Sequence, residues 1–460
     1  MTFSDYIDYL RGKRIGVIGF GVSNQPLVRV LLQNGCDVTV CDRRERAQLG
    51  AVGDEAAAQG AKFALGADYL EHLDFDVIFR TPGVLPIVPQ LRKAAQNGAI
   101  LTSEMEAFCN LCPCRILAIT GSDGKTTTST ITAELLRAQG YTVHLGGNIG
   151  TPLFDRIADI RPEDFAVLEL SSFQLHSMHC APDVAIITNI SPNHLDVHPD
   201  LEDYVSAKCS IYRGQRPDGV LVLNARDAHT PRFAAEAPGS VRYFSSVGPV
   251  ENGVYCSDGV IYRAHGGKAE KLIDVSDIRI PGAHNVENYM AAFAATDGLV
   301  GQAACVQVAR SFAGVPHRME RIRELNGITF INDSIASSPT RTIAGLHALP
   351  KPPVIILGGH DKHIPFDELG DEVCLHAKAA VVVGETAQRI AAAIRGSKFY
   401  DPGKLPLVEA QDFRAAVETA YRLAQPGDTV TLSPACSSFD LFKNFAERGD
   451  TFRAIVEDLQ

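Results

Sequence analysis

The residues with the clearest chemical meaning form a glycine-rich loop, TGSDGKT, at positions 120–126. An apolar run precedes this loop, and a segment with helical spacing follows it. A glycine loop between a strand and a helix points backbone N–H groups at phosphate, a lysine reaches the β and γ oxygens, and a threonine hydroxyl can bind Mg²⁺. We therefore predict a nucleoside triphosphate site, formed by Gly121, Ser122, Asp123, Gly124, Lys125, Thr126 and Thr127.

The match is to a shortened form of the phosphate-loop pattern. The full pattern G-x-x-x-x-G-K-[ST] needs a glycine at position 119, where this chain has Ile119. The alternative is an ordinary glycine-rich turn before a helix, with an exposed lysine.

Three further residues could serve this phosphate site. Glu169 lies at the end of an apolar strand-like run, and His194 lies in the loop after the next such run. Carboxylates at strand ends beside a phosphate loop are natural Mg²⁺ ligands. Lys208 lies in a helix-like segment. The alternatives are a carboxylate without a role, a structural histidine and a surface lysine.

The N-terminal segment 13–42 begins another α/β unit. A buried-strand run ends in Gly19 and Gly21, a helix-like stretch follows, and a second strand ends at Asp42 and Arg43. The glycine fingerprint is incomplete because its third glycine is replaced by Asn24. A nucleotide diphosphate bound at this turn and a tight turn with a solvated acidic cap both fit these residues.

Composition excludes several classes of protein. The chain has 460 residues, a net charge of −11, 45% apolar residues and 21% charged residues. A negative chain is poorly suited to nucleic acid. No apolar run approaches membrane-spanning length and no signal peptide is evident, so we expect a cytoplasmic protein and a monomer. The only cluster among eleven cysteines is Cys109, Cys112 and Cys114, which we interpret as free thiols because no second pair completes a zinc pattern.

Alternating strands and helices continue through the whole chain. They predict an α/β protein with three domains, each built on a mostly parallel sheet with flanking helices. A central P-loop ATPase-type domain lies between two Rossmann-like domains. A capping box at Ser103 and Glu106, and the helix-breaking residues near position 314, place the boundaries, giving 1–103, 104–314 and 315–460.

The motifs together resemble the Mur ligase family of ATP-dependent amide ligases in peptidoglycan synthesis. The resemblance covers essentially the whole chain and rests on TGSDGKTTT (120–128), GGNIG (146–150), LELSSFQL (168–175), NHLDVH (193–198), AHNVEN (283–288), PHRME (316–320), IND (331–333) and LGGHDK (357–362). In addition, LSPACSSFDLFKNFAERG (432–449) and GFGVSNQP (19–26) are similar to signatures of the branch that adds D-glutamate to UDP-N-acetylmuramoyl-L-alanine.

The resemblance implies a reaction and its cofactors. The alanine carboxylate attacks the γ-phosphate of ATP to form an acyl phosphate, and the amine of D-glutamate displaces the phosphate. Two Mg²⁺ ions and Lys125 would neutralise the phosphoryl group. Thr126 and Glu169 would hold one ion, while His194 and Lys208 would hold the other. Lys208 would act as a carbamate made from CO₂.

The resemblance also assigns binding residues. It places Asn288, Arg318 and Asp333 around ATP. The residues that match the UDP-sugar site are Ser23, Asp42, Arg43, Thr81 and Asn148, and those that match the D-glutamate site are Lys362, Ser438, Phe445 and Ser337.

One position departs from the family pattern. After Asn332-Asp333-Ser334 the family commonly has lysine, whereas this chain has Ile335. A cation expected near D-glutamate and phosphate is therefore missing, and Arg341 is a candidate to replace it.

Other functions remain open at this point. Another Mur ligase or a folylpolyglutamate synthase shares the central loop, and the C-terminal run 432–449 separates them. A dinucleotide-dependent oxidoreductase would leave Lys125, Glu169, His194 and Lys208 without a task. A regulator that binds nucleotide without catalysis is the third class.

Overall fold

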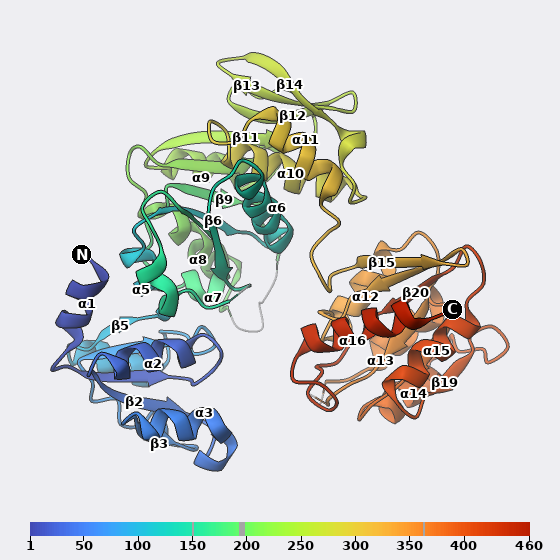
Figure 1. Cartoon of the computed structure of the whole chain (residues 1–460), viewed down its shortest axis with the longest axis horizontal. Helices are drawn as coiled ribbons and strands as arrows, with labels where there is room; N and C mark the ends of the chain where they lie inside the picture. Colours follow the sequence, from blue (N-terminus) through green and yellow to red (C-terminus); the bar gives the residue numbers. More distant parts are fainter. Residues whose placement is uncertain (150, 193–197, 362–363) are drawn as a thin grey trace. The chain divides into compact units, whose positions relative to one another are not determined.

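The computed structural model describes residues 1–149, 151–192, 198–361 and 364–460. The chain folds into two compact units, Met1–Phe312 and Ala313–Gln460. Figure 1 shows the strands and helices of each unit along the chain. The first unit contains two sheets and the second contains one.

The first sheet has five parallel strands in the order β3-β2-β1-β4-β5. Its strands are β1 (Arg14–Ile18), β2 (Asp37–Asp42), β3 (Lys62–Leu65), β4 (Val77–Arg80) and β5 (Ile100–Thr102). The order reverses between β1 and β4, and ligands bind at such switch points beyond the carboxyl ends of the strands. The helices are α1 (Phe3–Leu10), α2 (Asn24–Gln33), α3 (Arg46–Ala58), α4 (Pro89–Gln96) and α5 (Glu104–Leu111).

The start of α5 differs from the predicted capping box. Ser103 caps the helix by accepting from the backbone N–H of Glu106 at 3.1 Å. The Glu106 carboxylate does not return to Ser103; it accepts from the N–H of His179 at 2.9 Å and from the Thr102 hydroxyl at 3.1 Å. Glu106 therefore joins the first sheet to the segment that follows α7 (Ser172–Leu175).

The second sheet has nine strands in the order β14-β13-β12-β11-β10-β9-β6-β8-β7. Only the pairings of β12 with β13 and β13 with β14 are antiparallel. The strands are β6 (Arg115–Thr120), β7 (Val143–Gly147), β8 (Phe165–Glu169), β9 (Val184–Ile187), β10 (Val220–Asn224), β11 (Ser240–Ser245), β12 (Gly253–Ser257), β13 (Val260–His265) and β14 (Lys268–Asp274).

The centre of this sheet is buried on both faces. In β6, every residue after Arg115 is buried, which is typical of a parallel strand covered by helices on both sides. The helices and 3₁₀ turns of this part are α6 (Lys125–Ala138), η1 (Phe154–Asp159), α7, α8 (Leu201–Arg213), α9 (Thr230–Glu236), η2 (Val275–Asp277), α10 (Ala283–Ala295) and α11 (Gln302–Ser311).

The unit Ala313–Gln460 has a six-stranded sheet in the order β15-β16-β20-β17-β18-β19, antiparallel only between β15 and β16. Its strands are β15 (Glu320–Leu325), β16 (Ile328–Asn332), β17 (Val354–Leu357), β18 (Ala379–Val382), β19 (Leu407–Glu409) and β20 (Thr429–Leu432). The helices are α12 (Pro339–Ala348), α13 (Asp367–His376), α14 (Ala387–Gly396), α15 (Phe413–Leu423) and α16 (Phe445–Asp458).

These three mostly parallel sheets confirm the predicted fold class. Separate apolar clusters fill the two faces of the sheet in Ala313–Gln460. In the described part of the chain, no helix combines the length and the apolar character needed to cross a bilayer.

Candidate active site

The glycine loop after β6 is packed tightly against its neighbours. Gly121 and Gly124 have φ values of +147° and +77°. A Cβ on Gly121 would lie 1.9 Å from the Thr188 hydroxyl, and one on Gly124 would lie 2.3 Å from Asn288 Oδ1. At either position, a side chain would clash with its neighbour and the residue's backbone would be strained. Both positions therefore require glycine.

The lysine of this loop folds back over it. Lys125 Nζ donates to the carbonyls of Gly121 and Ser122, each at 2.9 Å. Ser122 is held from the other side, because its hydroxyl lies 2.9 Å from both the Ser191 carbonyl and the Tyr204 hydroxyl. Thr126 is buried at the start of α6, whereas Asp123 is exposed and Thr127 is half-buried.

Sheet register brings Glu169 to the loop. Ile119 of β6 pairs with Glu169 of β8, so both strands end at the same edge. The Glu169 side chain is 1% exposed. Its Oε1 accepts from Asn148 Nδ2 at 2.8 Å, while Oε2 is buried without a hydrogen-bond partner among the described residues. A buried carboxylate oxygen that lacks a donor is a suitable ligand for Mg²⁺.

Lys208 of α8 is buried beneath the same loop. Its side chain is 1% exposed, and Nζ donates to the Gly121 carbonyl at 2.7 Å. Its ammonium also lies over the Tyr204 ring, 4.7 Å from the centroid. Burial, and next the charge of Lys125, hold the pKa of Lys208 well below its usual value. The amine is therefore disposed to be neutral, which is the reactive form towards CO₂.

The start of α10 also reaches the loop. Asn288 is buried, its Oδ1 accepts from the Thr128 hydroxyl at 3.2 Å, and its Nδ2 donates to Asn285 Oδ1 at 3.2 Å. Together with the close approach to Gly124, these contacts bring Asn288 to the predicted nucleotide site.

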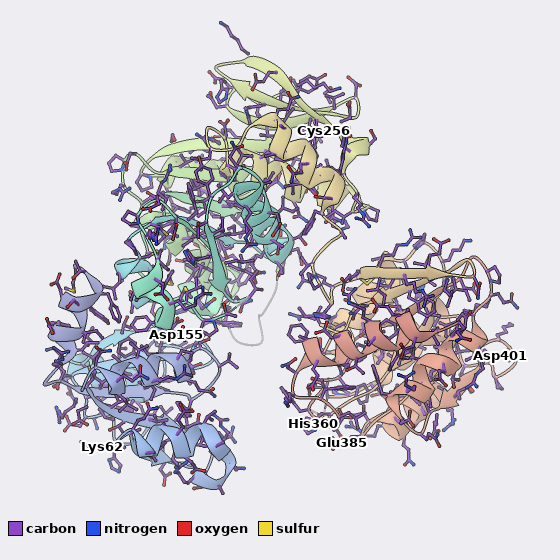
Figure 2. All side chains as sticks on the ribbon, in the orientation of Figure 1. Lys62, Asp155, Cys256, His360, Glu385 and Asp401 are labelled. Atoms are coloured by element: carbon purple, nitrogen blue, oxygen red, sulfur yellow. The ribbon has the colours of Figure 1, made fainter. Side chains whose placement is uncertain are left out.

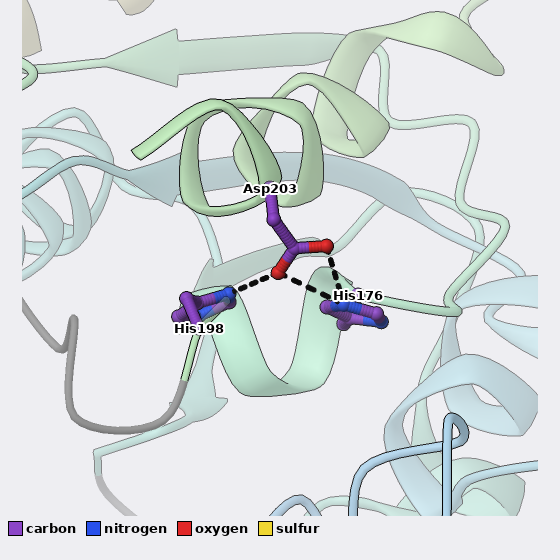
Figure 3. A group of neighbouring side chains, drawn as sticks. All are labelled: His176, His198 and Asp203. Carbon is purple, nitrogen blue, oxygen red and sulfur yellow. Dashed lines mark hydrogen bonds and ion pairs between the residues drawn. The ribbon is translucent and has the colours of Figure 1, made fainter. Parts of the chain in front are cut away.

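A histidine–aspartate group lies beside this site (Figure 3). Asp203 Oδ2 lies 2.6 Å from His198 Nδ1 and 3.2 Å from His176 Nε2. His198 Nε2 is hydrogen-bonded at 3.0 Å to the Ser172 hydroxyl. Burial opposes ionisation of Asp203, but the hydrogen bonds and charges of the two histidines outweigh it and lower the pKa of this carboxyl.

The Asp203 group connects the elements that carry the predicted metal ligands. Ser172 begins α7, directly after the strand that ends in Glu169, and Asp203 lies on α8 with Lys208. His198 is the first described residue after 193–197, so the predicted ligand His194 lies outside the described residues.

Four predicted UDP-sugar residues, Ser23, Asp42, Arg43 and Thr81, lie at or after the ends of strands of the first sheet, whereas Asn148 follows β7 and bonds to Glu169 in the second sheet. A Cβ on Gly19 would lie 2.8 Å from the side chain of Thr81, which follows β4. Asn24 replaces the third glycine of the fingerprint, and its amide donates to the carbonyls of Ile18 and Gly19 at 3.1 and 2.8 Å. Ser23, at the N-cap of α2, is exposed.

Asp42 has an internal partner at this switch point. Its carboxylate accepts from the N–H of Phe20 at 2.6 Å and from the Arg44 guanidinium at 2.9 and 3.0 Å. Burial opposes ionisation, but these contacts lower the pKa of Asp42. Arg43, the predicted binding residue, has an exposed side chain.

In the unit Ala313–Gln460, Asp333 lies at the end of β16. It is 4% exposed and accepts from the Ser433 hydroxyl at 2.9 Å and the Met319 N–H at 3.1 Å. Burial raises the pKa of Asp333 to about 6, against the smaller effects of these hydrogen bonds and of the charges on Arg318 and Arg341. Arg341 also lies 3.4 Å from the carbonyl of Ile335, where the family lysine is absent.

Of the predicted D-glutamate residues, Ser337 lies in the loop after β16, Ser438 in the loop after β20, and Phe445 at the start of α16. Ser438 is buried and Phe445, at the start of α16, is 39% exposed. Ser437 has a buried hydroxyl without a hydrogen-bond partner among the described residues. Ser337 is half-buried, and Lys362 lies outside the described residues. His360 Nδ1 lies 2.8 Å from Glu385, and Figure 2 shows the two side by side.

A buried arginine organises these loops. Arg448 is 2% exposed and donates to the Ser334 hydroxyl and carbonyl at 3.0 and 2.9 Å and to the carbonyls of Cys436 and Ser437 at 3.0 and 3.2 Å. Burial lowers the pKa of Arg448 to about 10. The loops after β16 and β20 are thereby joined through one side chain.

Sequence reasoning missed several of these residues. Arg44, Asp203 and Arg448 were not singled out, although Arg448 lies within the C-terminal run 432–449. Asp203 lies five residues before Lys208, a spacing that puts the two side chains on different faces of a helix, so no local signal connected them.

Comparison with known proteins identifies the family. The profile of the Mur ligase middle domain matches residues 119–296, and that of the Mur ligase glutamate ligase domain matches residues 317–436. A UDP-N-acetylmuramoylalanine–D-glutamate ligase from Acetivibrio thermocellus is 45% identical, with 99% of each chain covered. The protein of that name from Clostridium kluyveri is 44% identical, covering 100% of this chain and 99% of its own.

A solved structure supports the fold. The UDP-N-acetylmuramoylalanyl-D-glutamyl-2,6-diaminopimelate–D-alanyl-D-alanyl ligase from Acinetobacter baumannii has a TM-score of 0.54 at 18% identity, covering 100% of this chain and 92% of that one. With full-length relatives at 44 to 45% identity, the chain belongs to the Mur ligase family, among its UDP-N-acetylmuramoylalanine–D-glutamate ligases.

Proposed function

We propose that the protein joins D-glutamate to UDP-N-acetylmuramoyl-L-alanine in an ATP-dependent step of peptidoglycan precursor synthesis, acting as a cytoplasmic monomer. The observation that carries this proposal is the phosphate loop with Lys125, flanked by the buried carboxylate of Glu169, in a chain that matches ligases of this name along its whole length. Such a site suits transfer of a phosphoryl group to a carboxylate.

Two bond-forming steps follow from this chemistry. The carboxylate of the alanine attacks the γ-phosphorus of ATP, giving an acyl phosphate and ADP. The amine of D-glutamate then attacks the acyl carbon, loses a proton, and displaces inorganic phosphate as the amide forms. Lys125 and the N–H groups at the start of α6 would stabilise charge on the transferring phosphoryl oxygens.

Magnesium fits the residues beside the loop. Glu169 and Thr126 would hold one ion, and His194 with Lys208 would hold a second. Bound Mg²⁺ supplies charge neutralisation for the phosphate oxygens. The buried Glu169 Oε2, which lacks a donor among the described residues, supports the first position.

Lys208 is proposed to carry a carbamate formed from CO₂. Its Nζ is buried beside the loop, and the carbamate would offer the hard oxygen ligand that an ammonium group lacks. The neighbouring charge of Lys125 repels an ammonium here and would attract a carbamate.

Each predicted domain would bind one substrate. Residues 1–103 would bind the UDP-sugar through Ser23, Asp42, Arg43 and Thr81, with Asn148 contributed from the central domain. Residues 104–314 would bind ATP, assisted by Asn288 and by Arg318 and Asp333 of 315–460. That last domain would bind D-glutamate through Ser337, Lys362, Ser438 and Phe445.

The decisive experiment measures phosphate release from ATP by the purified protein with UDP-N-acetylmuramoyl-L-alanine and either D- or L-glutamate. Release should require both substrates and the D form. Release that ignores the amino acid, or prefers the L form, would point to another ligase, and absence of release would favour a nucleotide-binding regulator.

The carbamate has a separate test. Lys208→Ala should lose most ligase activity, and added short-chain carboxylic acids should restore part of it by replacing the missing carboxylate. A fully active Lys208→Ala protein would remove the carbamate from the mechanism. In the unaltered protein, ¹³C-labelled bicarbonate should give a carbamate signal in the NMR spectrum that is absent from Lys208→Ala.

A further inference from the structure

A pair of cysteines lies outside the proposed active site. All eleven cysteines lie within the described residues and are free thiols. Cys112 is the C-cap of α5, and Cys114 directly precedes β6, which leads into the phosphate loop. Their sulfur atoms lie 3.4 Å apart. The geometry of this turn therefore places two thiols in direct contact.

The residue between them maintains this contact. Pro113 has a fixed φ and restricts the residue before it to extended conformations. Cys112 has φ −58° and ψ +121°, and its N–H donates to the Phe108 carbonyl at 2.8 Å. The Cys-Pro-Cys turn is thus held at both ends, by the last turn of α5 and by the first residues of β6.

The two thiols are unequal. Cys112 is half-buried, whereas Cys114 is 7% exposed. A hydrogen bond with Cys114 lowers the pKa of Cys112, against burial and the nearby charges of Asp183 and Asp164. The other half-buried cysteines, Cys256 and Cys374, have pKa values raised by burial. Because Cys112 is the more exposed thiol, it is the one that an oxidant in solution can reach first, and Cys114 is the adjacent thiol that can resolve it.

We propose that Cys112 and Cys114 form an oxidative modification site at which a peroxide converts the dithiol into a disulfide. The Cys112 sulfur attacks one peroxide oxygen, the O–O bond breaks, and the leaving oxygen takes a proton to become water. The Cys114 sulfur then attacks the Cys112 sulfur, and the oxygen on Cys112 leaves with the Cys114 proton as a second water. Two electrons pass from the thiols to the peroxide.

This disulfide should be readily reversible. A bond between residues two apart closes a very small loop, so it gains little stabilisation from restricting the unfolded chain. Labile disulfides of this kind are reduced by ordinary dithiols. Oxidation would covalently join the end of α5 to the start of β6.

The test uses the full-length protein and hydrogen peroxide. After one equivalent of peroxide, denaturation and alkylation with N-ethylmaleimide, peptide fragmentation by mass spectrometry should locate a disulfide between Cys112 and Cys114. The modified peptide should lose two hydrogens and regain both alkylation sites after dithiothreitol. Cys256 and Cys374 serve as internal controls and should remain fully alkylated.

Two variants distinguish this pairing from its neighbours. Cys180 lies against Cys109, so Cys109→Ser tests a competing bond and should leave the Cys112–Cys114 disulfide unchanged. Cys114→Ser should leave Cys112 as a sulfenic or sulfinic acid. A disulfide between Cys109 and Cys180 in place of the Cys112–Cys114 bond, or oxidation of Cys256 equal to that of Cys112, would overturn the proposal, and both outcomes can be read from the unaltered protein alone.

Discussion

The buried carboxylate of Asp333 should destabilise the unit Ala313–Gln460 at neutral pH. The pKa of this group is raised from 3.8 to about 6, mainly by burial. Between these values the folded protein binds more protons than the unfolded chain, so its stability falls as the pH rises. At 1.36 kcal/mol per pKa unit, the charged form costs about 3 kcal/mol above this window.

Asp333→Asn removes the charge but can keep the local contacts. The amide oxygen can accept from the Met319 N–H, and its NH₂ group can donate to Ser433 Oγ. We therefore expect the variant to be more stable than the unaltered protein by up to about 3 kcal/mol at pH 7.5. At pH 5 the gain should fall to about half, and below pH 4 it should vanish.

Hydrogen exchange of the full-length protein, read by mass spectrometry in peptides from 313–460, measures this difference. At pH 7.5 the slowest-exchanging amides should gain up to about 100-fold protection, after correction for intrinsic rates. Asp450→Asn is the matched control, because that side chain is 68% exposed. If Asp333→Asn loses protection equally at pH 7.5 and at pH 5, the reasoning is refuted. The ligase activity of this variant should nevertheless fall, since Asp333 is proposed to bind ATP.

Substitutions at three further positions test the site. Glu169→Gln keeps an acceptor for Asn148 but removes the buried charge. Phosphate release by this variant should therefore need about tenfold more Mg²⁺. An unchanged Mg²⁺ titration would contradict the metal assignment. Arg341→Ala should raise the KM for D-glutamate while Arg341→Lys should not, if this arginine supplies the cation missing at Ile335. Asp203→Asn should lower the Tm by about 2–4 °C at pH 7. Because the pKa of Asp203 is lowered in the folded state, this stabilisation exists above the usual carboxyl pKa and is lost as the pH falls, so the two melting curves should converge in acid.

Local sequence patterns predicted the centre of each sheet and the edge strand β5, but not the other edge strands. The buried strands that became β1, β6, β8 and β17 are continuous apolar runs, which explains why they could be recognised. The short strand β3 and the outer strands β14, β15 and β19 were not predicted. In β3, no residue is fully buried, so its sequence carries little of the apolar signal of a core strand.

The site divides in the same way. Residues that follow a recognisable strand, such as Lys125 and Glu169, could be placed near one another because parallel strands end at one edge. The partners of Arg448 come from loops more than a hundred residues apart in the chain, at Ser334 and Ser437. Such contacts depend on the tertiary fold, and no local pattern encodes them.

The capping residue Glu106 shows a similar limit. Its spacing from Ser103 is correct for a capping box, yet its carboxylate accepts from the N–H of His179 and from the Thr102 hydroxyl instead of the Ser103 N–H. The His179 partner lies 73 residues further along the chain, so the local spacing could not indicate it.

One link within the unit Met1–Phe312 has a consequence for salt dependence. Arg80, at the end of β4 and next to Thr81, is 1% exposed and donates to the Ser177 hydroxyl at 2.7 Å and to the Phe173 carbonyl at 3.1 Å. Arg80 is buried and these partners are uncharged, so dissolved ions weaken the contact less than they weaken a surface ion pair. The first sheet should therefore keep its register against α7, beside Glu169, across a wide range of ionic strength.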